Sequence, residues 1–351
     1  MRWIFVAAAL LMAACSDPTG SQPCAVKLES GCWTHLGLEG KWITALAHTK
    51  WGLYAGTADD GVFRFDPAGR RWEPLGLDHA MVSSFVFVPG PTERLLVGVR
   101  PYADEQTAAA VFASEDQGLT WQPWDGGLAA RRGNRGWAFS LALDPGNPER
   151  LFMGYFDRIV RSEDGGRSWE FVWGDEASIG GGQFQAILIS PQRDGRVWAG
   201  GQTSLFTAMI LRSTDWGEAW EFVDPTLQHE NFVWALAADG AMSGQVFAGA
   251  GGGVMRSDDG GQTWRYVLSD VNGVVFSLAL LAEALYAVAS EDFEPEPAQP
   301  LGVYWSRDRG ESWERLVAPE SAGGGQALAV HPGGGLLVGT RGSGGVWLFE
   351  R

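Results

Sequence analysis

The chain has 351 residues, with 26 basic and 42 acidic side chains and a formal net charge of −16 at pH 7. A surface this acidic repels polyanions, so nucleic acid is not expected as a partner, and neither are bare anionic lipid headgroups.

The first residues are typical of a targeting segment. Arg2 precedes an apolar run over residues 3–14 that is too short for a comfortable membrane span. The ending "LMAAC" resembles the processing site of bacterial lipoproteins, which implies a lipidated Cys15 as the new N-terminus. Met12 departs from that pattern, so a simple cleaved signal stays open. We expect a signal peptide over residues 1–14 and a lipid-anchored tether over residues 15–24. The protein would then be an extracytoplasmic lipoprotein, anchored in the periplasm or at the cell surface.

Two further cysteines follow Cys15 in the sequence. Outside the cytosol disulfides persist, so we expect Cys24 and Cys32 to bond and close a small loop. Two free thiols are the alternative.

A short motif then repeats through the chain. "SEDGGRSW" at 162–169 recurs at 114–121, 213–220, 257–264 and 306–313 in the pattern S-x-D-x-G-x-[ST]-W, with Ala219 the one departure at the Ser/Thr position. A weakened copy, "FDPAGRRW", lies at 65–72, and "SGCW" at 30–33 keeps only the tryptophan. Internal repetition at about 40–50 residues is typical of propellers, arrays and solenoids.

Each repeat contains the same succession of short segments. Alternating apolar residues such as "WAFSLALD" (137–144), bounded by Gly, Pro and Asp clusters, predict strands. No segment shows a convincing amphipathic helix. Four strands per repeat predict an all-β fold, a single seven-bladed β-propeller over residues 25–351. Six or eight blades would follow only from a different interpretation of the weakened copies.

The two ends of the chain predict how the ring closes. "GGVWLFER" at the C-terminus aligns with "DGVFRFDP" (60–67), but no fourth strand follows it. "CWTHLGL" (32–38) supplies one from the N-terminal side. One blade would therefore be shared between the N- and C-terminal segments, which hides two open strand edges.

These repeats resemble the Asp-box (BNR-type) repeats of sialidases, sortilin-type receptors, xyloglucan-cleaving glycoside hydrolases and a photosystem II assembly factor. The resemblance implies that the box is the turn between the third and fourth strands of a blade. Its aspartate would accept turn N–H groups, and its tryptophan would be buried between sheets. The residues assigned this structural role are Asp116, Trp121, Asp164, Trp169, Asp215, Trp220, Asp259, Trp264, Asp308 and Trp313.

The boxes are weak candidates for metal binding. A calcium loop needs more oxygen ligands at fixed spacing and a closing glutamate, and no copy supplies them. His79 and His229 share a face with no cysteine or third histidine beside them. We expect no metal and no cofactor.

Candidate binding residues lie on the loops of the face opposite the boxes, because function is carried by loops on a rigid scaffold. Arg131, Arg132 and Arg135, with Arg100 on the adjacent loop, form a possible anion site. A solvated loop balanced by Asp104 and Glu105 is the alternative.

A second set is aromatic and lies near the starts of the inner strands. Flat apolar faces at a channel mouth suit sugars or peptide side chains, although several of these rings could instead be core. The set comprises Trp42, Trp137, Phe184, Phe232 and Trp234.

Enzyme signatures are incomplete. The nearest match to the sialidase Arg-Ile-Pro motif, "DRIV" (157–160), lacks the proline. Glycoside hydrolysis needs two carboxylates about 5–9.5 Å apart. Nothing in the sequence pairs any two of the acids on the loop face, which are Asp59, Asp60, Asp157, Glu176, Glu230 and Asp292. We therefore favour a monomeric, non-enzymatic module that binds a protein or glycan partner in the cell envelope. A carbohydrate-active hydrolase or lyase is the alternative.

Overall fold

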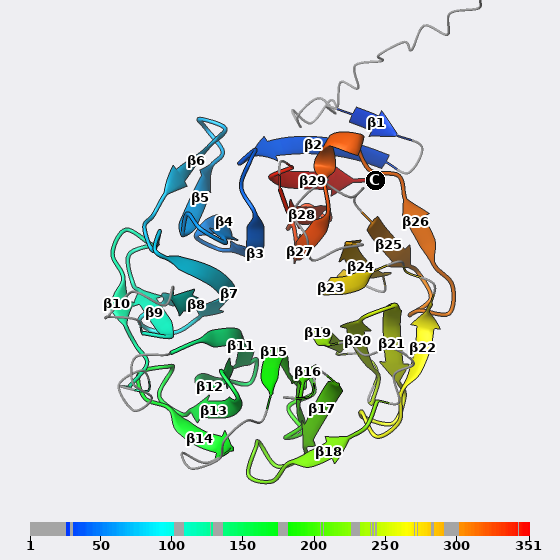
Figure 1. Ribbon diagram of the computed structural model, residues 1–351. Helices are drawn as coiled ribbons and strands as arrows, with labels where there is room; N and C mark the ends of the chain where they lie inside the picture. The colour runs from blue at the N-terminus through cyan, green and yellow to red at the C-terminus, as the bar shows by residue number, and fades with distance from the viewer. Residues whose placement is uncertain are drawn as a thin grey trace, which may run out of the picture.

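Seven antiparallel sheets are arranged as blades around a common axis in the computed structural model (Figure 1). The structure describes residues 26–28, 31–101, 109–126, 128, 136–174, 182–203, 205, 207–225, 232–238, 240, 242, 244–269, 271, 273–281, 284–290, 302–342 and 344–351. The predicted all-β, seven-bladed propeller is confirmed. Among the described residues no helix is long and apolar enough to cross a membrane.

The strands of the first three blades follow one another from the axis outward. Blade 1 comprises β3 (Ile43–Thr49), β4 (Gly52–Thr57), β5 (Val62–Asp66) and β6 (Arg71–Pro74). Blade 2 comprises β7 (Ala80–Val88), β8 (Arg94–Pro101), β9 (Val111–Ser114) and β10 (Gln122–Pro123). Blade 3 comprises β11 (Ala138–Asp144), β12 (Asn147–Tyr155), β13 (Arg158–Ser162) and β14 (Glu170–Trp173).

The next three blades repeat this order. Blade 4 comprises β15 (Gln183–Ile189), β16 (Val197–Gln202), β17 (Ala208–Ser213) and β18 (Glu221–Val223). Blade 5 comprises β19 (Val233–Ala238), β20 (Val246–Ala250), β21 (Gly253–Ser257) and β22 (Arg265–Leu268). Blade 6 comprises β23 (Val274–Leu281), β24 (Ala284–Ser290), β25 (Gly302–Ser306) and β26 (Glu314–Leu316). A 3-10 turn, η1 (Glu320–Ala322), leads to blade 7.

Blade 7 is built from both ends of the chain. The C-terminal segment supplies β27 (Gly325–Val330), β28 (Leu336–Thr340) and β29 (Val346–Glu350), and the N-terminal segment supplies β2 (Gly31–Gly37). β2 pairs antiparallel with β29, with Trp33 opposite Phe349 and His35 opposite Trp347. The predicted closure is confirmed. A further strand not predicted from the sequence, β1 (Val26–Leu28), pairs with the outer edge of β2. Cys32 on β2 is disulfide-bonded, whereas Cys24 lies outside the described residues.

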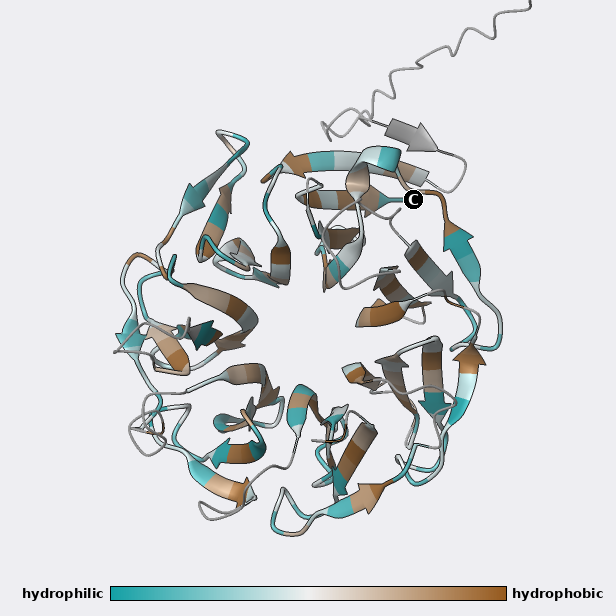
Figure 2. Cartoon of the chain, in the orientation of Figure 1, coloured by the Kyte–Doolittle hydropathy of each residue, from teal (hydrophilic) through white to brown (hydrophobic). Residues whose placement is uncertain are grey.

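Apolar side chains gather between neighbouring blades. One cluster joins Ile43 and Ala55 of blade 1 to Leu337 and Val346 of blade 7, all fully buried. Hydrophobic segments dominate the inner and middle strands, whereas hydrophilic ones are frequent on the outer strands and turns (Figure 2). Each blade has one edge at the central axis and the other at the outer surface. Its two faces can therefore be buried only against the neighbouring blades.

A glycine on the second strand of most blades permits this close packing. A Cβ added to Gly339 would lie 2.5 Å from Cγ2 of Ile43 on the next blade, and one added to Gly56 would lie 2.3 Å from Cγ1 of Val82. Such distances are shorter than any allowed carbon contact, so a side chain there would push the blades apart.

The box turns are held by their own side chains. In the third blade Ser162 Oγ donates to Asp164 Oδ1 (2.8 Å) and accepts from the amide of Gly166 (2.8 Å). Asp164 accepts the amide of Ser168 at Oδ1 (2.9 Å) and its hydroxyl at Oδ2 (2.6 Å). Both carboxylate oxygens are therefore engaged by the turn itself, which is the structural role predicted for the box.

The boxes also fasten one blade to the next. Trp169 is 6% exposed, and its Nε1 donates to the carbonyl of Trp124 at the end of the preceding blade (3.0 Å). In the same way Trp121 Nε1 donates to the carbonyl of Leu75 (2.7 Å). From the other side Arg161 of blade 3 donates to the carbonyl of Trp216 in the box of blade 4 (2.8 Å).

Removing β29 should open the ring. Truncation after Gly345 deletes the partner of β2 and exposes the apolar interface between blades 7 and 1, so the melting temperature should fall by more than ten degrees, because about 25 cal/mol is lost per Å² of apolar surface exposed. A control truncation that deletes only Arg351 should melt like the full chain. Equal melting of both truncations in calorimetry would contradict the closure.

The buried box tryptophan should contribute to folding alone. Trp169→Ala should cost about 3–5 kcal/mol of unfolding free energy, as expected for a large buried aromatic. Leu119→Ala, at a position 68% exposed in another box, should change it by less than about 0.5 kcal/mol. Urea titration measures both, and similar losses would contradict the assignment.

The box aspartates should make stability depend on acid pH. Hydrogen bonds from the hydroxyl and amide of Ser312 lower the pKa of Asp308 to about 2, from an ordinary 3.8. Because the folded-state pKa is the lower one, the unfolded chain binds more protons in this range, and stability present above pH 4 is lost as pH falls toward 2. The difference in melting temperature between wild type and Asp308→Asn should therefore narrow from pH 6 to pH 2. A constant difference would show that the carboxylate charge is not what holds the turn.

Candidate functional site in the central cavity

The innermost strand of every blade contains the same irregularity. The pairing register shifts across its second, third or fourth residue, as between Ile43 and Ala45 on β3, so one residue is left over as a β-bulge. We call these seven residues the central ring: Thr44, Ser83, Phe139, Gln185, Trp234, Phe276 and Gln326.

All seven residues of the central ring line a cavity of about 440 Å³ at the axis. A bulge turns a side chain out of the strand's regular alternation, and here it does so once in each blade. The volume is within the range of small-molecule and peptide pockets. None of the seven side chains is charged.

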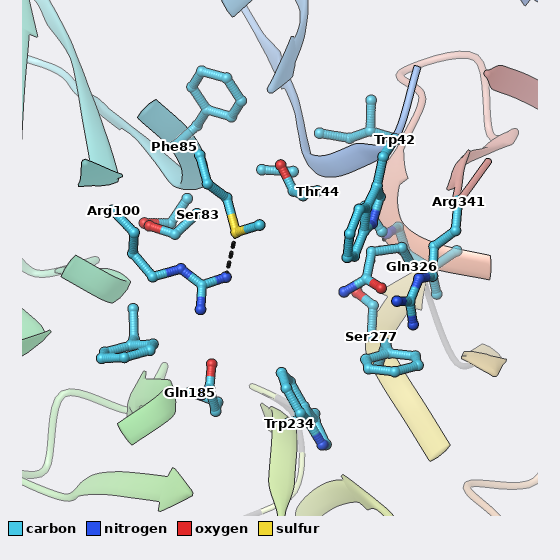
Figure 3. A pocket seen from close by; sticks show the side chains of 18 residues that line it. Trp42, Thr44, Ser83, Phe85, Arg100, Gln185, Trp234, Ser277, Gln326 and Arg341 are labelled. Atoms are coloured by element: carbon cyan, nitrogen blue, oxygen red, sulfur yellow. Dashed lines mark hydrogen bonds between the residues drawn. The ribbon is translucent and has the colours of Figure 1, made fainter. Parts of the chain in front are cut away.

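Two charged side chains line the cavity, and they come from the ends of the second strands of blades 2 and 7. Arg100 at the end of β8 and Arg341 just after β28 both line it, and Figure 3 shows their side chains on opposite sides. The Arg100 guanidinium lies 5.0 Å from the Phe139 ring centroid, and its Nη2 lies 2.6 Å from Met81 Sδ. Neither aspartate nor glutamate occurs among the described residues that line the cavity.

Arg341 is held by aromatic rings. It is 6% exposed, and its guanidinium lies 4.3 Å from the Trp42 ring centroid and 5.6 Å from that of Phe276. Such cation–π contacts fix a planar cation at low entropic cost. Trp42 precedes blade 1 and Arg341 belongs to blade 7, so the contact crosses the closure of the ring.

The structure brings together some predicted site residues and not others. Arg100, Trp42 and Trp234 line the cavity, and the Phe232 ring packs against the Trp234 ring at a tilt, with 5.1 Å between centroids. Trp137 does not line it among the described residues; its ring packs on Phe139 and Phe156.

Phe184 is fully buried between blades against Trp173, so the core alternative was the right interpretation there. Arg131, Arg132 and Arg135 lie outside the described residues, as do Cys15, Glu176, Glu230, Asp292 and His229.

The remaining candidate acids of the loop face are engaged elsewhere. Asp60 pairs with Lys41 (2.5 Å), and buried Asp157 pairs with the adjacent Arg158 (2.7 Å). Asp59 lies next to Asp60 on the β4–β5 turn of blade 1, whereas Asp157 lies on the β12–β13 turn of blade 3. No group of three metal-ligating side chains gathers within the described residues.

Arg341 was missed by the sequence analysis, although a signal for it exists. "LLVGVR" (95–100) and "LLVGTR" (336–341) are nearly identical, so Arg100 and Arg341 hold the same position in their repeats. The other five blades carry Ala58, Phe156, Gln202, Gly251 and Ser290 there. Aligning the repeats on the second-strand glycine would have placed both arginines together.

Known proteins share these features to different extents. Residues 255–266 match the BNR/Asp-box repeat. An oligoxyloglucan-reducing end-specific xyloglucanase from Emericella nidulans is 29% identical over 182 residues, 49% of this chain and 22% of that enzyme. Photosystem II assembly lipoprotein Ycf48 from Synechococcus sp. is 26% identical over 202 residues, 56% of this chain and 55% of that protein.

Solved structures show the same fold. A GH74 xyloglucanase from Xanthomonas campestris superposes with a TM-score of 0.67 at 20% identity, covering 91% of this chain and 53% of that one. YCF48 bound to D1 peptide gives 0.63 at 16% identity, covering 93% and 98%. The chain thus spans about half of the xyloglucanase structure and nearly all of YCF48.

The fold and the boxes define the class by structure: the chain is a seven-bladed β-propeller in which residues 255–266 match the BNR/Asp-box repeat. It is related both to xyloglucanases and to the Ycf48 assembly factors.

Proposed function

We propose that this chain is a non-enzymatic binding module that recognises a protein partner in the cell envelope through its loop face and central cavity. The observation that carries the proposal is the lining of the cavity. Two arginines and several aromatic rings face it, and no carboxylate does so among its described lining residues. Glycoside hydrolysis requires an acid and a second carboxylate about 5–9.5 Å apart, whereas binding an anionic or apolar segment does not.

The relatives support this reading in part. A structure of YCF48 holds a D1 peptide, so a single propeller of this size can bind a polypeptide segment. In structural superposition this chain covers 98% of that propeller but only 53% of the GH74 xyloglucanase chain. Identities of 16–29% carry no residue role across, so the partner is inferred from the chemistry of this cavity.

An envelope location belongs to the same proposal. The apolar run before Cys15 would direct export, and lipidation of Cys15 would hold the propeller at a membrane surface, with residues 15–24 as the tether. The acidic surface would keep the propeller off the headgroups while the anchor retains it. Envelope proteins near that membrane would then be the accessible partners.

A carbohydrate-active hydrolase is the second candidate. It is favoured by the similarity to xyloglucanases and by the aromatic residues Trp42 and Trp234 at the cavity, since flat rings also suit sugar faces. Such an enzyme would take its catalytic acids from the loop face, where Glu176, Glu230 and Asp292 are the remaining candidates.

Capture from an envelope extract of the source organism distinguishes the two functions. Wild type should retain a protein partner, and a variant with Arg131, Arg132 and Arg135 changed to alanine should bind it about tenfold more weakly, since each exposed ion pair contributes roughly 0.5 kcal/mol. The loss should shrink at high salt.

A matched control removes three exposed charges, Arg70, Arg71 and Arg265, and should bind like wild type. The same preparations are incubated with xyloglucan oligosaccharides. Release of reducing sugar that one carboxylate-to-amide substitution abolishes would overturn the proposal in favour of the hydrolase.

A further inference from the structure

We propose that the central cavity receives an uncharged carboxamide, the side chain of an asparagine or glutamine of a protein partner, and that Gln326 and Trp42 recognise it. The inference rests on the proposed function, because it takes the partner to be a protein. It adds which chemical group of that partner enters the cavity.

Gln326 and Trp42 each bring an unpaired polar atom to the cavity. Gln326 Oε1 and Trp42 Nε1 are out of contact with solvent, and neither has a hydrogen-bond partner within the described residues. Both side chains line the cavity. A buried polar atom without a partner costs free energy, which a ligand recovers by pairing with it. These two atoms therefore indicate where a hydrogen-bonding ligand is stabilised.

The two side chains lie on the same side of the cavity. Gln326 is the bulge residue of β27, and two positions before it the carbonyl of Gly324 accepts the backbone amide of Arg341 (2.7 Å). The Trp42 ring centroid lies 4.3 Å from the Arg341 guanidinium. Both side chains thus adjoin the same residue, and Figure 3 shows them together on that side. One small group can therefore reach both.

The two unpaired atoms need opposite partners. Gln326 Oε1 only accepts, so it needs a donor, and Trp42 Nε1–H only donates, so it needs an acceptor. A primary amide presents its C=O and one of its N–H groups along the same edge and can pair with both atoms. A trans peptide group points its C=O and N–H in opposite directions and cannot do so. The primary amides of proteins are the side chains of asparagine and glutamine.

The arginines of the cavity favour an uncharged ligand. Arg341 stacks on the Trp42 ring, and Arg100 lies 5.0 Å from the Phe139 ring centroid. Both arginines also take part in further interactions within the protein. An anion would have to compete with those interactions, and a cation would be repelled by two guanidinium groups. A neutral amide leaves the arginine contacts in place.

The remaining walls suit the rest of such a ligand. Phe139, Trp234 and Phe276 present rings from three blades, on which the methylene groups of the entering side chain can pack. A volume of about 440 Å³ holds one side chain with the short turn that carries it. The partner should therefore present its amide at the tip of a loop.

The test is calorimetric titration of the full propeller with peptides N-acetyl-Ala-X-Ala-N-methylamide, whose blocked ends have neither a charge nor a primary amide. X is glutamine, asparagine, glutamate, methionine, or glutamine with both side-chain N–H groups methylated. The better of the two amides should bind at least about tenfold more tightly than the last three peptides, because each of those leaves Gln326 Oε1 without a donor.

Two variants and a matched control assign the preference to the cavity. Gln326→Met removes the acceptor at similar volume and should abolish the preference for the amide. Because it also removes an unpaired buried oxygen, it should melt at least as high as wild type, which a structural role for Gln326 would not give. Trp42→Phe keeps a ring beside Arg341, removes the donor and should weaken the amide peptides severalfold. Gln262→Met, the same change at an exposed position of a box turn, should leave binding unchanged.

Equal affinity for the glutamine, methionine and methylated peptides would overturn the proposal, since water would then suffice for the two atoms. So would an undiminished amide preference in folded Gln326→Met. If that variant does not fold, Trp42→Phe decides, and unchanged binding of the amide peptides by it overturns the proposal.

Two further outcomes separate this inference from the proposed function. If no peptide shows the amide preference while wild type still captures an envelope protein, the carboxamide is wrong and the binding module stands. If a neutral xyloglucan oligosaccharide binds in a Gln326-dependent manner and peptides do not, the cavity is a sugar site, and the protein partner fails with the carboxamide.

Discussion

The antiparallel pairing of β2 with β29 is the contact on which the rest of the structure depends. It joins residues more than 300 positions apart in sequence, with Trp33 opposite Phe349. Closing a loop of that length costs conformational entropy, and the buried interface between blades 7 and 1 offsets it. The central cavity depends on the same pairing, because Arg341 and Gln326 reach it from blade 7 and Trp42 reaches it from the blade 1 side.

Within the closed ring, two repeated backbone features set the dimensions of the site. Second-strand glycines such as Gly56 and Gly339 allow adjacent blades to approach until an added Cβ would overlap the next inner strand. The bulge on each inner strand then directs one side chain toward the axis. The backbone therefore determines where the seven side chains of the central ring point, and the residue type at each position determines their chemistry.

The Asp-box turns and the central cavity have different roles and lie in different parts of each blade. Asp116, Asp164, Asp259 and Asp308 each accept a turn hydroxyl at Oδ2 as well as a turn amide at Oδ1, whereas Asp215 is engaged at Oδ1 by the amide of Ala219. Trp169 donates its Nε1–H to the neighbouring blade. The box side is therefore committed to holding the ring together. The axis is where charge is concentrated on a few residues, with Arg341 fixed by stacking and Arg100 facing it.

The sequence by itself determined the repeat, the strand content, the number of blades, the structural role of the boxes and the closure. The repeat, the strand content and the number of blades follow from local signals, since alternation, turn residues and the box pattern act over a few residues at a time. The structural role of the boxes was implied by the resemblance to Asp-box proteins, and the closure followed from aligning the two ends of the chain. The sequence also pointed to Arg100, Trp42 and Trp234. Only the tertiary structure showed that these three share a cavity with Arg341 and Gln326, that Phe184 is core, and that Trp137 packs beside the cavity rather than in it. The reason is geometric: a one-residue bulge decides which side chain of an inner strand faces the axis, and ring closure brings the first and last blades side by side.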